Sequence, residues 1–236
     1  MSVPRADAEM ELNRKSRRGF TLIELFVVIT VLAILMALLF PAFKGVQDQA
    51  KRTQAKNDLT QIVTAVGAYY SEYGKMPVDD AKQGFDTLVG DPNGSYDNAY
   101  VFDIMRAIAD SKWNANNQYN PKQINFFSGP DAKSATAPRF GFATQDTTVN
   151  GISIKKGALL DPWGNEYLVG LDSDYDSWTQ QFFSYADLPY TTKSGGAGDW
   201  PAVQANATAS SWGKDSKFGN GGDSKYNHSD DVISWQ

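Results

Sequence analysis

The sequence has no cysteine and a single histidine, His228, among its 236 residues. Exported domains usually gain stability from disulfides, so a chain without them must rely on a large core or on a bound metal. Zinc sites are built mainly from cysteine and histidine, and Ser-His-Asp hydrolases need a histidine beside their nucleophile. The composition therefore argues against a zinc site and against these enzyme classes, and we expect no enzymatic activity.

Positive charge is also scarce. The chain has 22 basic and 27 acidic residues, and five of the basic ones lie within residues 1–19, which leaves 17 basic and 24 acidic side chains for the remainder. Nucleic-acid binding requires basic surface to replace counterions, so an acidic body argues against it. The same surface is compatible with binding a divalent cation.

One long hydrophobic run is present, from Phe20 to Phe40. As a helix, its 21 residues would span about 31 Å, close to the hydrocarbon thickness of a bilayer. Basic residues directly precede the run, which predicts a cytoplasmic N-terminus and an exported remainder. The run ends in a poor match to the small-residue site of a cleaved secretory signal. A plain membrane anchor explains its length but not its one carboxylate, Glu24, which is costly in a membrane unless it is paired. An acid in the first turns is also favoured by the helix dipole.

The stretch "RRGFTLIEL", residues 17–25, resembles the prepilin-type leader of type IV pilins and type II secretion pseudopilins. The resemblance implies that a prepilin peptidase cuts after Gly19 and that Phe20 becomes an N-methylated N-terminus. Glu24 is then the fifth mature residue, and Pro41 falls where the family often has a proline. The resemblance also implies that, in a filament, Glu24 faces the Phe20 amine of the neighbouring subunit, which offsets the cost of burying both charges.

After this run the chain is polar and then amphipathic. Apolar residues recur with helical spacing and predict one face packed on a core. They are Leu59, Ile62, Val63, Val66, Tyr69, Tyr70 and Tyr73. Gly74 and Pro77 are expected to end the helix, and Pro41 to kink or loosen it. We therefore expect a leader at 1–19, a stem helix at 20–75 whose residues 20–40 span a membrane, and a globular domain at 76–236.

The globular part is rich in glycine and proline, which predicts short elements. We expect a helix near 101–109, strands within 139–144, 152–160, 166–172 and 181–186, and long loops at 112–137 and 186–210. The glycine-rich segment 191–200 has the composition of a flexible loop. A long helix packed on a small antiparallel sheet is an α+β arrangement. It is the pilin-like fold that the resemblance implies, although residues 85–155 are more than a minimal major pseudopilin needs.

Two further segments resemble the major pseudopilins of type II secretion. In "DPWGNEYLV" we expect Pro162 and Gly164 to form a tight turn, Asp161 and Asn165 to bond local backbone, and Trp163 to act as a packing anchor. We interpret these five residues as structural.

The C-terminal segment 210–236 resembles a loop that holds calcium in that group. Carried over residue by residue, the resemblance implies a calcium ion held by aspartates and backbone carbonyls, which are the oxygen ligands that calcium prefers. The implied ligands are the carbonyls of Trp212 and Lys217 and the carboxylates of Asp215, Asp223, Asp230 and Asp231. A solvated acidic turn without metal is the alternative. A weaker candidate is the series Asp172, Asp174 and Asp176, which lacks the glycine and the bidentate glutamate of an EF-hand loop.

These features predict a structural subunit of a type II secretion pseudopilus, anchored in a bacterial inner membrane with its globular domain in the periplasm. The expected partners are copies of itself, other pseudopilins, the prepilin peptidase and an assembly platform in the membrane. One alternative is a type IV pilus subunit. Another is a membrane-anchored glycan-binding module that uses aromatic residues, namely Trp178, Tyr190, Trp200 and Trp212.

Overall fold

The computed structural model describes residues 19–91, 96–181, 183–195, 198–219 and 223–236. The basic flank of the expected leader therefore lies outside the described residues, as do the side chains of Pro41 and Ala42. The chain divides into two units, residues 1–47 and 48–236, which are described one at a time. The longest element, α1 (Leu22–Tyr73), contributes to both units and is continuous through Pro41. The hydrogen bond that proline removes therefore does not end the helix.

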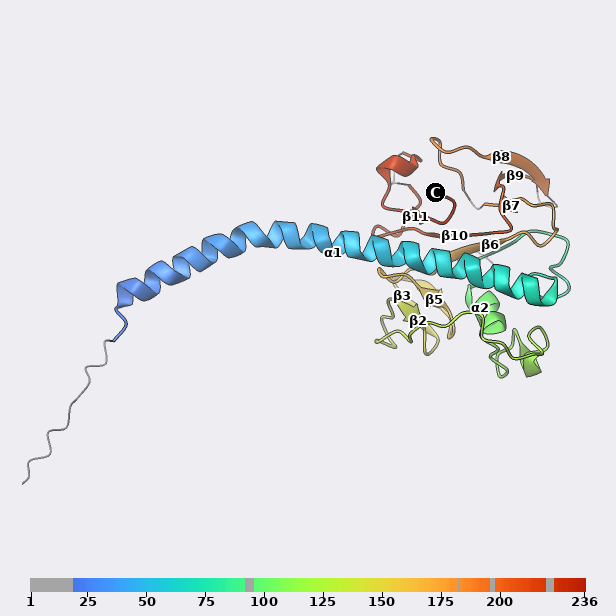
Figure 1. The fold of residues 1–236 in the computed structure, drawn as a ribbon, viewed down its shortest axis with the longest axis horizontal. Coiled ribbons are helices and arrows are strands. Elements are labelled where there is room, and N and C mark those ends of the chain that lie inside the picture. Colours follow the sequence, from blue (N-terminus) through green and yellow to red (C-terminus); the bar gives the residue numbers. More distant parts are fainter. Residues whose placement is uncertain (1–18, 92–95, 182, 196–197, 220–222) are drawn as a thin grey trace, which may run out of the picture. The chain divides into compact units, whose positions relative to one another are not determined.

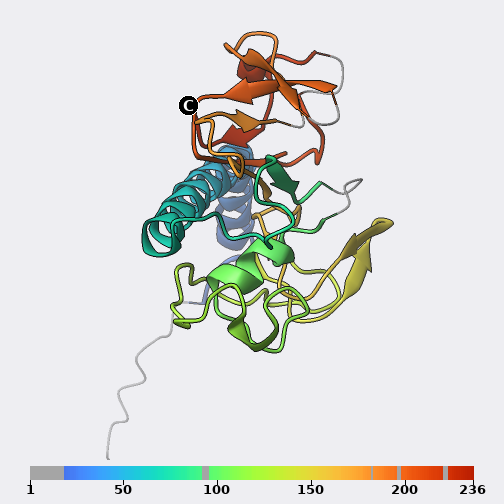
Figure 2. The ribbon, with the colours of Figure 1, turned by 90° about the vertical axis from the view of Figure 1, so that its right-hand side faces the viewer.

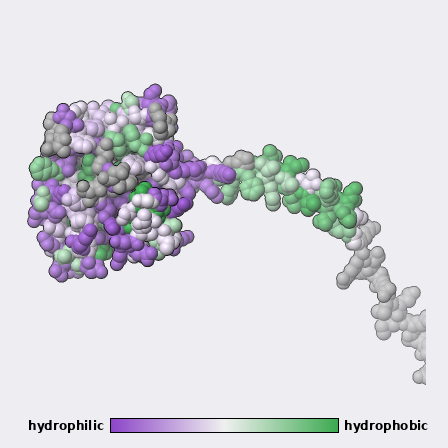
Figure 3. Space-filling model, turned by 180° about the vertical axis from the view of Figure 1, so that it is seen from behind, coloured by the Kyte–Doolittle hydropathy of each residue, from purple (hydrophilic) through white to green (hydrophobic). Residues whose placement is uncertain are grey.

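The first unit contains the apolar part of α1. Its residues are mostly Leu, Ile, Val, Ala and Met, so no polar face forms. The large apolar side chains are exposed, from 85% at Leu22 to 47% at Val28. Figure 3 shows this apolar surface in green. By length and composition this part of α1 could cross a membrane.

The second unit is built on the polar half of α1. Leu59, Ile62, Val66 and Tyr69 are at most 1% exposed, as their spacing predicts. Burial of each such side chain contributes roughly 1.5–3 kcal/mol. Tyr70 was also expected in the core, and this is wrong: it is 36% exposed. Its ring contacts only the ring of Tyr175 among the described aromatic residues, at a centroid distance of 6.0 Å.

The helix ends where the sequence predicts. The last helical residue is Tyr73, and Gly74 follows in the left-handed region at φ +66°. The Gly74 N–H donates to the Tyr70 carbonyl at 2.8 Å. Glycine adopts this conformation without a Cβ penalty, which is why it terminates the helix.

The principal sheet has four antiparallel strands in the order β1-β6-β10-β11. Their bounds are β1 (Thr87–Val89), β6 (Leu168–Leu171), β10 (Ala207–Ser211) and β11 (Val232–Ile233). Val169 is paired with Val89 on one side and Ala209 on the other, and all three belong to the same core cluster as the buried face of α1. Figures 1 and 2 show α1 running alongside this sheet.

Shorter elements complete the unit. The helical ones are α2 (Ala99–Met105) and the 3₁₀ turns η1 (Ala115–Asn117) and η2 (Tyr226–His228). Two strand pairs form, β2 (Gly141–Phe142) with β5 (Leu159–Leu160) and β3 (Thr147–Val149) with β4 (Ile152–Ile154). A three-stranded sheet has the order β7 (Thr179–Gln180), β9 (Gly198–Val203) and β8 (Thr191–Gly195). Every residue of α2 is buried. Figure 2 places α2 and the β3–β4 hairpin on the opposite side of α1 from the C-terminal strands. The arrangement is α+β, as predicted.

Three local predictions need correction. The helix expected at 101–109 spans Ala99–Met105 and ends before Ala107, whose φ of +57° is left-handed. No strand forms among the described residues of 181–186, because the pairing with β9 stops at Gln180. The described residues of segment 191–200 are not a loop: β8 pairs with β9 from Thr191↔Ala202 to Gly195↔Gly198, so 186–210 also holds three strands.

Candidate functional site

Reciprocal hydrogen bonds between Thr21 and Glu24 cap the N-terminus of α1. The backbone N–H and the hydroxyl of Thr21 donate to Glu24 Oε2 at 2.8 and 2.6 Å, and the Glu24 N–H donates to Thr21 Oγ1 at 3.3 Å. This is a capping box, which satisfies otherwise free N–H groups of the first turn. Thr21 was not singled out from the sequence, although its T-x-x-E spacing to Glu24 is a readable signal.

The capping box fixes Glu24 near the expected cut. Gly19 and Phe20 are exposed, and Phe20 retains 77% of its surface. Cleavage after Gly19 would leave the Thr21 N–H and hydroxyl in place, so the box can persist in a mature chain. Among the described residues Glu24 Oε1 has no hydrogen-bond partner and remains available as an acceptor.

The turn that begins at Asp161 is organised by that carboxylate. Asp161 is fully buried, and its Oδ1 accepts the backbone N–H groups of Trp163, Gly164 and Asn165 at 2.9, 2.7 and 2.9 Å. Gly164 has φ +106°, which a residue with a side chain rarely adopts. Pro162 is buried, and Trp163 packs against the main core. Burial raises the pKa of Asp161, and these donors oppose that effect.

The same turn holds the start of the C-terminal loop. Ser211 at the end of β10 donates its hydroxyl to Asp161 Oδ2 at 2.6 Å, and Asn165 Nδ2 donates to the Gly213 carbonyl at 2.8 Å. The turn and the loop are thus fastened by hydrogen bonds between residues about fifty positions apart.

Three of the predicted calcium ligands lie close together in that loop. The Asp215 N–H donates to Asp230 Oδ2 at 3.1 Å, and Asp230 Oδ2 also accepts the N–H of Lys214. Gly213 lies close to Asp230, since a Cβ added to it would lie 2.4 Å from the Asp230 carbonyl oxygen. Asp231 follows directly, and the charges of Asp230 and Asp215 act on it.

Asp231 is the most buried member of this group. It is 0% exposed, and its Oδ2 accepts the Tyr185 hydroxyl and the Gly219 N–H, both at 2.8 Å. Its Oδ1 is buried and has no hydrogen-bond partner among the described residues. Burial above all, together with the neighbouring carboxylates, raises the pKa of Asp231 to about 6.

The other predicted ligands are placed differently. Asp223 accepts the Lys225 N–H at 2.8 Å and pairs with His228 Nδ1 at 2.7 Å, and this contact lowers its pKa. Lys217 is exposed, and its N–H donates to Asp215 Oδ1 at 2.9 Å. Trp212 is partly buried, and its indole N–H has no hydrogen-bond partner among the described residues. Asp215, Asp230 and Asp231 are therefore the members of the set that interact with one another.

The donor chemistry of this group suits a hard cation, although its three carboxylates are not gathered within 4.8 Å of one another as those of Asp86, Asp172 and Asp174 are. A buried carboxylate oxygen without a donor is costly, and two further carboxylates beside it add repulsion. A calcium ion takes six to eight oxygen ligands and would offset both costs. The residues present can supply carboxylate and carbonyl oxygens.

A second acidic cluster lies elsewhere in the unit. Carboxylate oxygens of Asp86, Asp172 and Asp174 are all within 4.8 Å of one another, so the weaker sequence candidate gains Asp86 as a neighbour, with Asp176 outside the group. Burial raises the pKa of Asp86 to about 7 and is also the main reason why the pKa of Asp172 rises to about 6. The Asp172 oxygens already accept the N–H groups of Asp176 and Ser177.

None of the cavities found among the described residues is lined by all four aromatic residues of the glycan alternative. Trp178 and Tyr190 line one cavity of about 330 Å³. Trp212 lines another, of about 180 Å³. Trp200 lies on β9, paired with Lys193 of β8.

Comparison with known proteins agrees with the N-terminal part of this description. Residues 14–40 match the prokaryotic N-terminal methylation motif, and residues 43–139 match the protein G family of the type II secretion system (T2SS). The chain is 39% identical over 84 residues to the type II secretion system core protein G of Pseudomonas aeruginosa, covering 36% of this chain and 58% of that protein. It is 36% identical over 88 residues to the fimbrial protein EcpC of Eikenella corrodens, covering 37% and 56%. The chain thus spans less than two thirds of the length of these two relatives.

A third relative gives a longer match. The chain is 30% identical over 132 residues to the type II secretion system core protein G of Pectobacterium carotovorum subsp. carotovorum, covering 53% of this chain and 83% of that protein. No solved structure matches significantly. The motif and the helix-on-sheet fold define a pilin-like protein with a prepilin-type N-terminus. Within that class, the chain belongs to the protein G family of type II secretion, the pseudopilins.

Proposed function

We propose that this chain is a structural subunit of a type II secretion pseudopilus. A prepilin peptidase cuts it after Gly19, Phe20 becomes the N-methylated N-terminus, and the apolar part of α1 moves from the inner membrane into a filament core. The globular domain lies in the periplasm before assembly. Copies of the chain, other pseudopilins and a membrane assembly platform are its partners, and it catalyses no reaction.

The observation that carries this proposal is the position of the Glu24 carboxylate, which hydrogen bonds from Thr21 keep at the start of α1. It stands in the first turn of an otherwise apolar segment, with one oxygen bonded to Thr21 and the other free of partners among the described residues. A cut after Gly19 creates a new amine one residue before Thr21. Pairing this amine with Glu24 of a neighbour would leave neither charge alone in the filament core.

Glu24→Ala tests the assembly step. Loss of one partner of a buried charge pair costs about 3–5 kcal/mol, so the filament fraction should fall at least tenfold while leader cleavage continues. Because the chain has no cysteine, single introduced cysteines allow clean crosslinking between subunits. Lys44→Gln removes one exposed charge from the same helix and should assemble normally. Filaments of Glu24→Ala at the wild-type level would rule out the charge-pair mechanism.

We also propose that the C-terminal loop binds one calcium ion as a structural ligand. The partnerless Oδ1 of Asp231 and the adjacent Asp215 and Asp230 support this. Calcium bound to the folded loop alone stabilises the fold by mass action, by about 2.7 kcal/mol at a free concentration one hundred times the Kd. Chelation should lower the Tm of the wild type and leave that of Asp231→Asn unchanged. Equal effects of chelation on both proteins, or none on either, would argue against this site.

A type IV pilus subunit remains the second candidate, because the fimbrial relative matches a stretch of similar length. The two candidates share the cut, the stem and the charge pair. Deletion of the gene distinguishes them: loss of exported proteins from the medium indicates secretion, whereas loss of surface pili with intact secretion indicates a pilus.

A further inference from the structure

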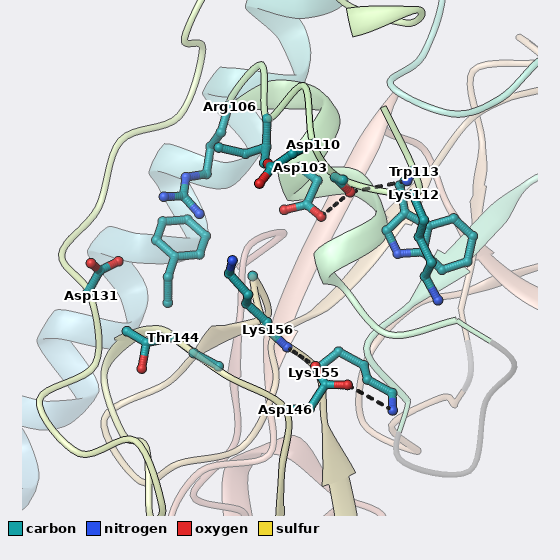
Figure 4. A pocket seen from close by; sticks show the side chains of 15 residues that line it. Asp103, Arg106, Asp110, Lys112, Trp113, Asp131, Thr144, Asp146, Lys155 and Lys156 are labelled. Carbon is teal, nitrogen blue, oxygen red and sulfur yellow. Dashed lines mark hydrogen bonds and ion pairs between the residues drawn. The ribbon is translucent and has the colours of Figure 1, made fainter. Parts of the chain in front are cut away.

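A cavity of about 550 Å³ lies beside the C-terminal end of α2, within the part of the chain that has no role in the proposed assembly. Its walls come from residues 103–113 on one side and from residues 131–157 on the other. Figure 4 shows the side chains that line it. The volume is within the usual range of small-molecule sites, about 300–1,000 Å³.

Arg106 is the central cation of this cavity. Its Cζ lies 3.6 Å from the ring centroid of Phe142, so the guanidinium stacks on the ring. The Arg106 backbone N–H donates to the Phe102 carbonyl at 2.8 Å, but its guanidinium makes no hydrogen bond or ion pair with any described residue. Stacking leaves the N–H edges of a guanidinium free, and these edges match the two oxygens of a carboxylate.

Lys156 adds a second available cation. Figure 4 shows its side chain directed toward the space between Arg106 and Asp103. Its Nζ makes no hydrogen bond or ion pair with the described residues, whereas the other two lysines of the wall are engaged. Lys155 pairs with Asp146 at 3.6 Å, and Lys112 lies 4.0 Å from the Trp113 ring centroid.

Asp103 supplies an acceptor beside these cations. It is only 8% exposed, and its Oδ2 accepts the hydroxyl of Ser111. Its Oδ1 has no hydrogen-bond partner among the described residues. A Cβ on Gly157 would lie 2.6 Å from that oxygen, so the glycine leaves room for it. A hydroxyl group on a ligand could donate to this oxygen.

We propose that this cavity binds a small hydroxylated carboxylate, the chemical class of sugar acids and hydroxy acids. The ligand carboxylate binds Arg106 and Lys156, and a ligand hydroxyl donates to Asp103. The remaining acids of the wall, among them Asp110 and Asp131, disfavour a multiply charged anion such as phosphate. Family membership does not assign such a site, and filament assembly does not require one.

Calorimetric titration of the full-length chain in detergent micelles tests the proposal, with D-glucuronate as probe. A ligand of this size should bind with a Kd on the order of 1 mM. Two control compounds should each bind at least about tenfold more weakly than glucuronate. Glucose lacks the carboxylate, and inorganic phosphate lacks the alcohol hydroxyl groups. No binding of glucuronate at ten times the expected Kd, or equal binding of either control compound, would overturn the proposal.

Variants locate the binding. Arg106→Gln should weaken glucuronate binding about tenfold or more, and Lys156→Gln several-fold. Lys133→Gln removes an exposed charge outside the cavity and should leave the Kd unchanged. If Arg106→Gln fails to fold by circular dichroism, the exposed Lys156 carries the test, because its replacement disturbs no buried contact. An equal loss with Lys133→Gln, or an unchanged Kd with Lys156→Gln, refutes the assignment.

Discussion

Replacing Asp161 with alanine should destabilise the globular unit more than any surface change. The Asp161 carboxylate accepts five hydrogen bonds, three from backbone N–H groups and two from the side chains of Asn165 and Ser211. Hydrogen bonds to a charged group contribute about 1.5–3 kcal/mol each, but burial raises the pKa of Asp161, and removing the carboxylate also removes that cost. We expect a net loss of about 3–5 kcal/mol, a large part of the 5–15 kcal/mol typical of a folded domain.

Urea unfolding of the full-length chain in detergent, followed by near-ultraviolet circular dichroism, measures this loss. Ser211→Ala serves as the matched control, because it removes one of the five bonds, together with the bond from the Gly213 N–H to the Ser211 hydroxyl, and should cost about 1.5–3 kcal/mol. Asp161→Asn keeps one oxygen for the three backbone donors and should fall between the two. An Asp161→Ala protein within about 0.5 kcal/mol of the wild type would refute this account of the turn.

Three further predictions follow from buried polar groups of the same unit. Burial raises the pKa of Glu166 to about 7 from its ordinary 4.5. The stability that Glu166 contributes is therefore full below about pH 4.5 and is lost as the pH rises through 7. In thermal melts across pH 5–8, Glu166→Gln should be more stable than the wild type at pH 8, by up to about 3 kcal/mol. Asn98→Ala removes three hydrogen bonds between the start of α2 and the neighbouring strands and should cost about 3 kcal/mol in urea unfolding. Asn165→Ala frees the Gly213 carbonyl and should reduce the rise in Tm on calcium addition.

Each of these has a control. Glu72→Gln removes an acid from an exposed ion pair with Lys122 and should change stability by less than about 1 kcal/mol. If it alters the pH profile as much as Glu166→Gln does, the effect is one of net charge and not of burial. Asn98→Asp should not restore stability, because a carboxylate cannot donate to the two carbonyls that Asn98 bonds. An undiminished calcium response in Asn165→Ala would show that the loop holds its shape without the turn.

The stem was predictable because its signals are local. The apolar run, the basic flank and Glu24 follow one another along the chain, and the spacing of Leu59 and Ile62 identified the buried face. Hairpin β8–β9 was missed because its glycine-rich composition is typical of a linker, whereas pairing with β7 across the sheet makes its residues strands.

The sequence by itself determined the class of this protein, because cleavage motif, membrane-length helix and amphipathic continuation depend on neighbouring residues alone. The tertiary structure decided which acids meet. Asp231 becomes a buried carboxylate with one partnerless oxygen only through packing against Tyr185 and Gly219, and Asp86 joins Asp172 only because β1 and β6 are adjacent strands. The cavity around Arg106 likewise depends on segments brought together by the fold. Burial and pairing between distant segments are properties of the packed chain, and no local pattern encodes them.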